Sequence, residues 1–185
     1  MQRFSIYLST SLMLAAPLTV PAAQVVYTFT TLAGSAGSAG SANGVGSAAR
    51  FNTPEGVAVD SAGNVYVADR ENKTIRKITP DGGVSTLAGS TGVSAVVDGS
   101  GAAARFDRPS GMAVDSTGNL FVSDSQTIRK VTPGGVVSTL AGVVGSRGGG
   151  DGTGSAARFS FPQGVAVDSA GNVFVADWEN HTVRK

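Results

Sequence analysis

The chain has 185 residues, enough for one domain with a hydrophobic core, and 41% of them are hydrophobic and 15% charged. Its 14 basic and 13 acidic residues nearly balance, which argues against nucleic acid or an anionic membrane as a partner. The absence of cysteine excludes disulfides, thiolate zinc sites and a cysteine nucleophile. The 26 glycines and 7 prolines indicate many turns and few helices.

The N-terminus has the pattern of an export signal. Arg3 supplies the positive charge, residues 4–18 are mostly apolar, and small residues follow, so we expect residues 1–22 to be cleaved off after Ala22. A membrane anchor is the alternative, but the apolar run is short and contains Pro17. Cleavage would remove Arg3 and no other charge. The expected product is a neutral chain without a membrane span, which is secreted, periplasmic or on the cell surface.

The sequence after the signal, residues 24–185, repeats one pattern three times. The stretch PEGVAVDSAGNVYVADRENKTIRK at 54–77 returns, with changes, at 109–130 and 162–185. Self-similarity of this kind means that one structural unit is copied, and that each copy buries its apolar faces against its neighbours. We place the repeats at approximately 51–89, 106–142 and 159–185.

The first elements after the signal are an outer strand and a loop. Residues 24–34, QVVYTFTTLAG, match the last strand of a repeat, so we expect a leading outer strand there. Residues 35–50 are rich in Gly, Ser and Ala, which is typical of a disordered linker. The loop recurs at nearly constant length before each ARF segment, however, and this favours a structured surface connection.

Four antiparallel strands are predicted in each complete repeat. In the first repeat, residues 56–59 and 65–68 are apolar on both alternating faces, which predicts strands buried on both faces. A turn at 60–64 joins them, and strands at 74–79 and 84–88 complete a meander. A sheet buried on both faces must lie between two similar sheets. Radial stacking of such sheets gives an all-β propeller of four-stranded antiparallel blades.

The pattern P-x-G-V-A-V-D-x-x-G-N-V-Y-V-A-D-x-x-N-x-x-I-R-K resembles the NHL repeat, and the resemblance covers all of residues 24–185. It implies a propeller, usually of six blades, with the GVAVD strand nearest the central channel. NHL propellers are mostly binding platforms for proteins, peptides, glycans or RNA, and related propellers include lactonases and a peptide-amidating lyase.

About three blades are present, and the third stops at Lys185 within its third strand. Three blades are too few to close a ring. The chain is therefore expected to be a fragment of a longer reading frame, or else two chains make one ring. The stop inside TVRK favours the fragment.

Positions identical in every copy are most simply explained by the blade. Asp60, Asp115 and Asp168 follow the GVAV or GMAV strand, and we interpret them as acceptors of turn N–H groups. Coordination of calcium by their oxygen atoms is the weaker alternative. The same turn role is expected for Asp69, Asp124 and Asp177. Three recurring arginines, Arg50, Arg105 and Arg158, are expected to bind a carboxylate or carbonyls between blades, with a substrate role as the alternative.

Positions that differ between copies are better candidates for a binding surface, because the blade does not dictate them. They are the middle residue of P-x-G and the loop after the second inner strand, which is two residues shorter in the middle copy and should be tighter. Trp178 is the candidate anchor, since aromatic residues are enriched at interfaces. Drift of the loop sequence is the alternative. The candidates are Glu55, Arg70, Lys73, Ser110, Gln163, Trp178 and His181.

The residues point to binding more than to catalysis. His181 is the only histidine, which excludes a multi-histidine metal site within this chain. An enzyme would need residues on the inner strands that break the symmetry of the repeat, such as an extra His, Glu or Asn, and the strands GVAVD, GMAVD and GVAVD carry none. We predict an exported, non-catalytic binding or scaffold module for a protein, peptide or glycan, with calcium as the one candidate cofactor. The alternatives are a metal-dependent propeller enzyme, similar to a lactonase or peptide-amidating lyase, and a structural surface protein. A homodimer is expected only if the chain is not truncated.

Overall fold

The computed structural model describes residues 26–185, and the expected signal at 1–22 lies outside the described residues. Thr31–Lys185 form one compact unit, which carries all the strands described below. Within residues 26–185, no helix has the length and apolar character needed to cross a membrane.

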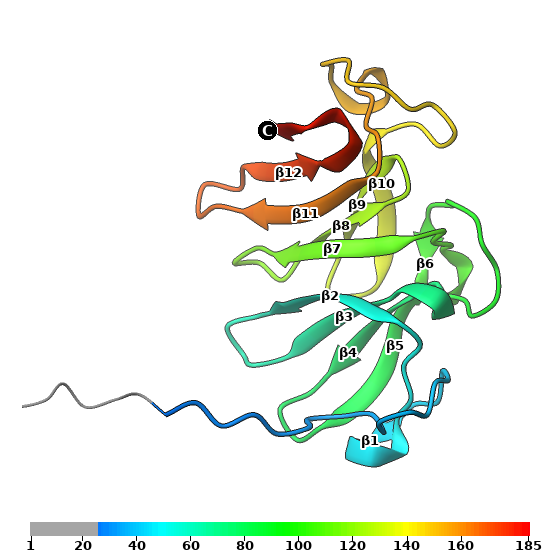
Figure 1. Ribbon diagram of the computed structural model, residues 1–185, viewed down its shortest axis with the longest axis vertical. Coiled ribbons are helices and arrows are strands. Elements are labelled where there is room, and N and C mark those ends of the chain that lie inside the picture. Colours follow the sequence, from blue (N-terminus) through cyan, green and yellow to red (C-terminus); the bar gives the residue numbers. More distant parts are fainter. Residues whose placement is uncertain (1–25) are drawn as a thin grey trace, which may run out of the picture. The chain divides into compact units, whose positions relative to one another are not determined.

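Three antiparallel sheets follow one another along the compact unit, and Figure 1 shows them stacked face to face in chain order. Each is built from consecutive strands, as the meander prediction requires. The first sheet contains β2 (Pro54–Val59), β3 (Val65–Asp69), β4 (Thr74–Ile78), β5 (Gly83–Gly89) and the short β1 (Gly44–Val45). The second contains β7 (Pro109–Val114), β8 (Leu120–Asp124), β9 (Thr127–Val131), β10 (Val136–Gly142) and the short β6 (Gly99–Ser100). The third contains β11 (Pro162–Val167), β12 (Val173–Asp177) and β13 (Thr182–Arg184).

The four long strands of each complete sheet confirm the predicted blade, and the short fifth strands were not predicted. β1 pairs with β5 through Gly44 and Val84, and β6 pairs with β10 in the same manner. Both short strands lie in the Gly/Ser/Ala loops and lead into 3-10 turns, η1 (Gly46–Ala48) and η3 (Gly101–Ala103). The loops therefore make regular hydrogen bonds with the sheet edge, as expected of a structured connection. The third loop contains η4 (Gly154–Ala156) alone.

Residues 26–34, the described part of the predicted leading strand at 24–34, form no strand and make no strand pairing. A strand needs a hydrogen-bonded neighbour, and none of the described strands lies beside this segment as a partner. Its last residues nevertheless pack on the first sheet. Ala33 contacts the cluster that contains Ala49 and Val84, and Gly34 N donates a hydrogen bond to Gly46 O at 3.0 Å.

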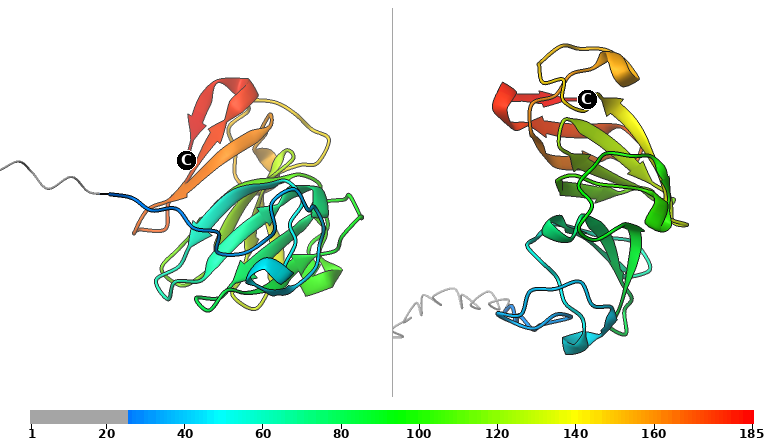
Figure 2. Two further views of the ribbon diagram at one scale, coloured as in Figure 1. Left: turned by 60° about the horizontal axis from the view of Figure 1, so that its bottom comes forward. Right: turned by 90° about the vertical axis from the view of Figure 1, so that its right-hand side faces the viewer.

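The hydrophobic core lies between adjacent sheets. Tyr66, Ala68 and Ile75 of the first sheet pack against Met112, Leu120 and Val122 of the second in one buried cluster. A second cluster joins Ile128 of the second sheet to Phe159 and Val175 of the third repeat. Figure 2 shows the stacked sheets from two further directions. Burial of each Leu or Val side chain contributes roughly 1.5–3 kcal/mol.

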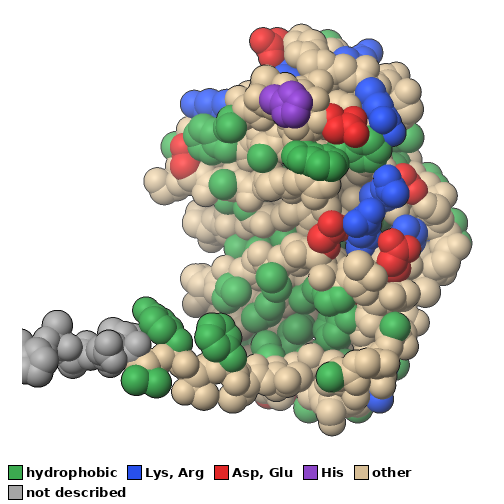
Figure 3. All heavy atoms as spheres, viewed as in Figure 1, with side chains coloured by type: hydrophobic (Ala, Val, Ile, Leu, Met, Phe, Trp, Pro, Cys, Tyr) green, Lys and Arg blue, Asp and Glu red, His purple; other side chains and the backbone are tan. Residues whose placement is uncertain are grey.

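The first and third sheets each have one face without a neighbouring sheet. We call this face of the first sheet, lined by Val57, Val65, Val67 and Ile78, the leading face, and that of the third, lined by Ala166, Phe174, Ala176 and Val183, the trailing face. On the leading face, Val67 and Ile78 are buried by Ala33, Ala49 and Phe51. The prediction that the inner strands are buried on both faces holds for β8 but is wrong for β2, where Val57 is 63% exposed. Figure 3 shows green apolar side chains gathered in the hollow beside the first sheet.

Candidate functional site

The aspartates after the first inner strand act as turn acceptors. Asp60 accepts hydrogen bonds from the backbone N–H groups of Ala62 and Asn64 and from the Asn64 amide at 2.8 Å. Asp115 and Asp168 accept the same set in their own repeats. Because the turn satisfies both carboxylate oxygens, these residues hold the hairpin in place. The conformation also needs a positive φ, which Gly63 supplies at 82°.

These hydrogen bonds favour the ionised carboxylates. The Asn64 amide lowers the pKa of Asp60, and Asn172 does the same for the pKa of Asp168. Slight burial raises the pKa of Asp115, but hydrogen bonds from Asn119 and Thr117 outweigh it and lower the value to about 2. Calcium coordination by these three aspartates stays an untested prediction. Within residues 26–185, no three acidic or histidine side chains come close enough to hold a metal ion together.

The second set of recurring aspartates forms buried ion pairs. Asp69 lies 2.8 Å from a guanidinium nitrogen of Arg76, and both side chains are fully buried. Asp69 also accepts hydrogen bonds from Asn52 N and from the Asn72 amide, both at 2.7 Å. The carboxylate thus ties the loop before β2, the turn after β3 and strand β4 together. The same pairs recur as Asp124 with Arg129 at 3.1 Å and Asp177 with Arg184 at 3.2 Å.

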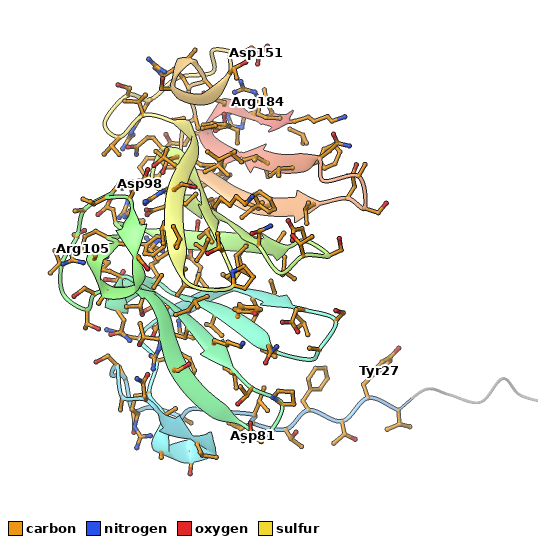
Figure 4. The ribbon with its side chains drawn as sticks, turned by 180° about the vertical axis from the view of Figure 1, so that it is seen from behind. Tyr27, Asp81, Asp98, Arg105, Asp151 and Arg184 are labelled. Atoms are coloured by element: carbon orange, nitrogen blue, oxygen red, sulfur yellow. The ribbon has the colours of Figure 1, made fainter. Side chains whose placement is uncertain are left out.

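The recurring loop arginines bind carbonyl oxygens of their own loops and not groups between blades. Arg50 donates hydrogen bonds to the carbonyl oxygens of Ser47 and Ala49, at 2.5 and 2.7 Å, and Arg105 and Arg158 repeat this arrangement. The expectation that they bind groups between blades is wrong. Each arginine closes the 3-10 turn of its own loop, whose carbonyls are left without helical partners. Figure 4 places Arg105 at the edge of the second sheet, on that loop.

The middle repeat closes its loop differently. Only Ser125 and Gln126 separate β8 from β9, which confirms the predicted tighter loop. The asparagine that donates to Asp69 and Asp177 is missing. Asp124 keeps the hydrogen bond from Asp107 N, which is equivalent to that of Asn52 N, and accepts a further one from Arg108 N. Burial raises the pKa of Asp124 to about 6, although these N–H groups and the Arg129 charge act in the opposite direction.

Four of the seven variable candidates converge on one shallow pocket. Glu55 and Arg70 come from the first repeat, Ser110 from the second and Gln163 from the third. The strands β2, β7 and β11 bring Glu55, Ser110 and Gln163 together, because adjacent sheets pack with these strands side by side and each starts at P-x-G. Arg70 follows β3 and reaches Glu55. The enclosed volume is only about 20 Å³, enough for one small polar group. A ligand there would lie mostly on the surface and insert a single group.

Charged and aromatic side chains surround this pocket. Arg70 pairs with Glu55 at 3.1 Å, and its buried Nε lies 3.7 Å from Glu71 Oε1 without making a hydrogen bond within residues 26–185. The guanidinium of Arg147 lies 4.0 Å from the centre of the Phe161 ring, and that of Arg108 lies 5.7 Å from it. Figure 3 shows acidic and basic side chains next to one another on the face in view. The site can therefore offer guanidinium donors and an aromatic surface to a ligand.

The remaining candidates lie outside the pocket lining. Trp178 is 62% exposed at the start of η5 (Trp178–Asn180), and His181 is exposed directly after that turn. Lys73 follows η2 (Arg70–Asn72) and lies 3.7 Å from Glu71. Both Lys73 and His181 adopt a left-handed conformation, with φ of 59° and 56°. The structure thus does not bring these three to the site that the other four share.

Several residues at this site were missed from the sequence. Ser123 replaces the alanine of the other repeats, and its hydroxyl lies 2.9 Å from the Ser110 hydroxyl and donates to Gln163 O at 2.8 Å. Arg108 and Phe161 precede the recurring proline, where the first repeat has Thr53. All of these positions differ between copies, so the test that selected Ser110 could also have found them. Phe161 has a φ of 49°, a strained conformation for an aromatic residue.

The repeats and the sheets have counterparts among known proteins. The NHL repeat family matches residues 51–78 and 159–185. The chain is 32% identical over 146 residues to the protein SUPPRESSOR OF QUENCHING 1, chloroplastic, of Arabidopsis thaliana, which covers 72% of this chain and 14% of that protein.

Two solved bacterial structures resemble the compact unit. A structural genomics protein of unknown function from Bacteroides thetaiotaomicron is 34% identical with a TM-score of 0.61, over 65% of this chain and 31% of that one. An auxiliary nutrient binding protein from Bacteroides ovatus, 24% identical with a TM-score of 0.64, covers 75% of this chain and 38% of its own. The similarity to the auxiliary nutrient binding protein, at 24% identity, shows the fold alone. The chain spans less than two fifths of each of these proteins. With its three stacked antiparallel sheets, this chain has the fold of part of a β-propeller and carries NHL repeats.

Proposed function

We propose that the chain is an exported, non-catalytic binding module, which holds a protein, peptide or glycan on the face where the P-x-G residues gather. One observation carries the proposal. Glu55, Ser110 and Gln163 are the variable residues at one position of three otherwise similar repeats, and they line the same pocket. The structure of the blade is the same in each repeat and gives no reason for these three residues to differ.

The chemistry of the pocket supports a ligand with acceptor oxygen atoms. The Arg70 Nε is a buried donor that makes no hydrogen bond among the described residues, and its nearest carboxylate oxygen, Glu71 Oε1, lies 3.7 Å away. A carboxylate or carbonyl oxygen inserted beside it would complete the bond. The Phe161 ring, held by Arg147, offers an apolar surface to the same ligand. Acidic peptides and uronic acid glycans carry both kinds of group.

The similarity to auxiliary nutrient binding proteins agrees with this proposal, although at 24% identity it concerns the fold. Export is proposed from the sequence of residues 1–22. The module would then meet its ligand in the periplasm, at the cell surface or outside the cell.

Binding to arrays of oligosaccharides and peptides tests the proposal. The arrays contain neutral and uronic acid glycans beside acidic, neutral and basic peptides. We expect binding to an acidic class, and at least a tenfold loss of affinity in Arg70→Ala and Gln163→Ala. Lys130→Ala is the matched control, since it removes a positive charge from a strand that does not line the pocket, and its binding should be unchanged.

Two results would overturn the proposal. One is equal binding by wild type, Arg70→Ala and Lys130→Ala, which would place the ligand elsewhere. The other is metal-dependent turnover of a lactone or peptide, with calcium or zinc bound at a fixed stoichiometry in calorimetry. That outcome would establish the enzyme alternative.

A further inference from the structure

One position in each Gly/Ser/Ala loop contacts the arginine that forms the buried ion pair of the same repeat. It lies at the same distance before the ARF segment in every copy and is always followed by glycine. Its side-chain Oδ1 accepts a hydrogen bond from the arginine Nη2, at 2.7 Å in the first repeat, 2.8 Å in the second and 2.6 Å in the third. The pairs are Asn43 with Arg76, Asp98 with Arg129, and Asp151 with Arg184. Figure 4 shows both residues of the third pair at the outer end of the third sheet. The first repeat thus has an amide where the other two have a carboxylate.

The surroundings of Asn43 suit a carboxylate. In the second repeat the Thr139 hydroxyl donates a hydrogen bond to Asp98 at 2.9 Å, and Thr86, the counterpart of Thr139, lies 3.4 Å from Asn43 Oδ1. Partial burial raises the pKa of Asp98, but hydrogen bonds from Thr139 and Arg129 outweigh this effect and lower the pKa. The position therefore favours an ionised carboxylate over a neutral one.

Arg76 has one carboxylate partner where Arg129 has two. Arg129 binds the buried aspartate of its own repeat and also Asp98, whereas Arg76 binds only Asp69 among the described acidic residues. The place that Asp98 takes beside Arg129 is filled beside Arg76 by the neutral amide of Asn43. An aspartate at position 43 would make the two repeats equivalent in charge.

The residue that follows Asn43 makes this amide reactive. Asn43 is the only asparagine of the chain that precedes a glycine, and the backbone nitrogen of a glycine, which has no side chain in the way, can reach the asparagine Cγ. Asn43 is exposed, and the next strand, β1, has two residues at the edge of its sheet, so few hydrogen bonds must open for this approach. The Arg76 guanidinium binds Oδ1 and draws electron density away from Cγ, which makes Cγ a better electrophile.

We propose that Asn43 is a site of spontaneous deamidation and that Arg76 receives the aspartate that forms. The deprotonated Gly44 nitrogen attacks Asn43 Cγ, the bond between Cγ and the side-chain nitrogen breaks, and that nitrogen takes a proton from water and leaves as ammonia. The product is a cyclic succinimide, which water then opens. Attack of water at Cγ restores the backbone and gives aspartate, whereas attack at the main-chain carbonyl carbon gives isoaspartate. Overall one water molecule is consumed and one ammonia is released.

The aspartate product gives the first repeat the charge pattern of the other two. It adds one negative charge to the loop and a second carboxylate to Arg76. Isoaspartate instead lengthens the backbone before β1 and places its carboxylate elsewhere. The proposal goes beyond ligand binding and does not depend on it.

Peptide mass spectrometry of the purified, folded protein tests the reaction. After incubation in mildly alkaline buffer, we expect the peptide that contains Asn43 to show the mass change of deamidation, and the other asparagines to stay unchanged as internal controls. These are Asn52, Asn64, Asn72, Asn119, Asn172 and Asn180. Fragmentation that separates aspartate from isoaspartate measures how much product can pair with Arg76. An unmodified Asn43 in folded protein, under conditions that modify it in urea-unfolded protein, would overturn the proposal, and so would isoaspartate as the sole product.

Two exchanged variants test the role of Arg76 and of the loop position. Asn43→Asp installs the product, and Asp98→Asn creates the same reactive Asn-Gly pair at the equivalent place in the second repeat. We expect Asn43→Asp to melt about 1–3 °C above freshly prepared wild type, and Asp98→Asn to melt lower by a similar amount, because each changes one partly exposed ion pair. On incubation Asp98→Asn should deamidate in both loops, and its melting temperature should rise. A melting temperature of Asn43→Asp at or below that of wild type would show that Arg76 does not receive the carboxylate. Absence of reaction at position 98 in Asp98→Asn would contradict the assignment of the reaction to this loop position.

Discussion

Arg129 has one buried and one exposed carboxylate partner, so the contributions of a buried and an exposed ion pair to stability can be compared at the same residue. Arg129 binds Asp124, which is fully buried, and Asp98, whose side chain is half exposed. Removing one member of a buried pair leaves an uncompensated charge, so Asp124→Ala should lower the free energy of unfolding by about 3–5 kcal/mol. Asp98→Ala should lower it by about 1 kcal/mol or less. Urea unfolding of both variants measures the difference. Equal losses of unfolding free energy in the two variants would show that the buried pair stabilises the blade no more than the exposed one.

The turn aspartates predict a pH dependence. The pKa of Asp115 is lowered to about 2 in the folded chain, below its ordinary value of 3.8. Its contribution to stability is therefore complete above pH 4 and is lost as the pH falls towards 2. Asp115→Ala should cost about 1 kcal/mol at pH 7, since solvent screens this carboxylate, and less at pH 2. Melting temperatures at the two pH values test this. A difference between variant and wild type that grows on acidification would have the wrong sign.

At the scale of the strand, burial depends on which sheet lies next to it. Leu120 of β8 is fully buried between the first and second sheets, so Leu120→Ala should cost about 2–5 kcal/mol through lost transfer energy and the cavity left behind. Val136 of β10, in the same sheet, is half exposed, and Val136→Ala should change stability by about 0.5 kcal/mol or less. Thermal unfolding compares them. Similar costs would mean that the inter-sheet core is not the main source of stability.

The elements that the sequence predicted are those with a repeating pattern. The alternation of apolar residues located the four long strands, and the Asp-x-x-Gly-Asn turn located the hairpin between the inner two. The short strands β1 and β6 were missed, because Gly44–Val45 and Gly99–Ser100 carry no strand pattern and pair only because β5 and β10 offer an edge. The leading strand was expected from its sequence, but hydrogen bonding requires a partner, and the described chain supplies none.

Part of the candidate site was also predictable from the repeating pattern of the sequence. Comparing repeats selected Glu55, Arg70, Ser110 and Gln163, which do meet, because equivalent positions of adjacent sheets lie side by side. It could not place Arg147, which reaches the Phe161 ring from a glycine-rich loop that the pattern leaves undefined. The sequence placed Arg76 in the predicted strand at 74–79 but did not predict its burial, which depends on the ion pair with Asp69, a contact between strands that sequence spacing does not reveal.

At the scale of the whole molecule, three sheets are stacked in the order of a propeller, and the starts of β2, β7 and β11 meet in one shared pocket. Calorimetric titration of the purified protein with an acidic oligosaccharide or peptide found on the arrays tests the central claim that this pocket binds a ligand. We predict at least tenfold weaker binding by Arg70→Ala and unchanged binding by Lys130→Ala. Equal binding by the wild type and both variants would contradict the account.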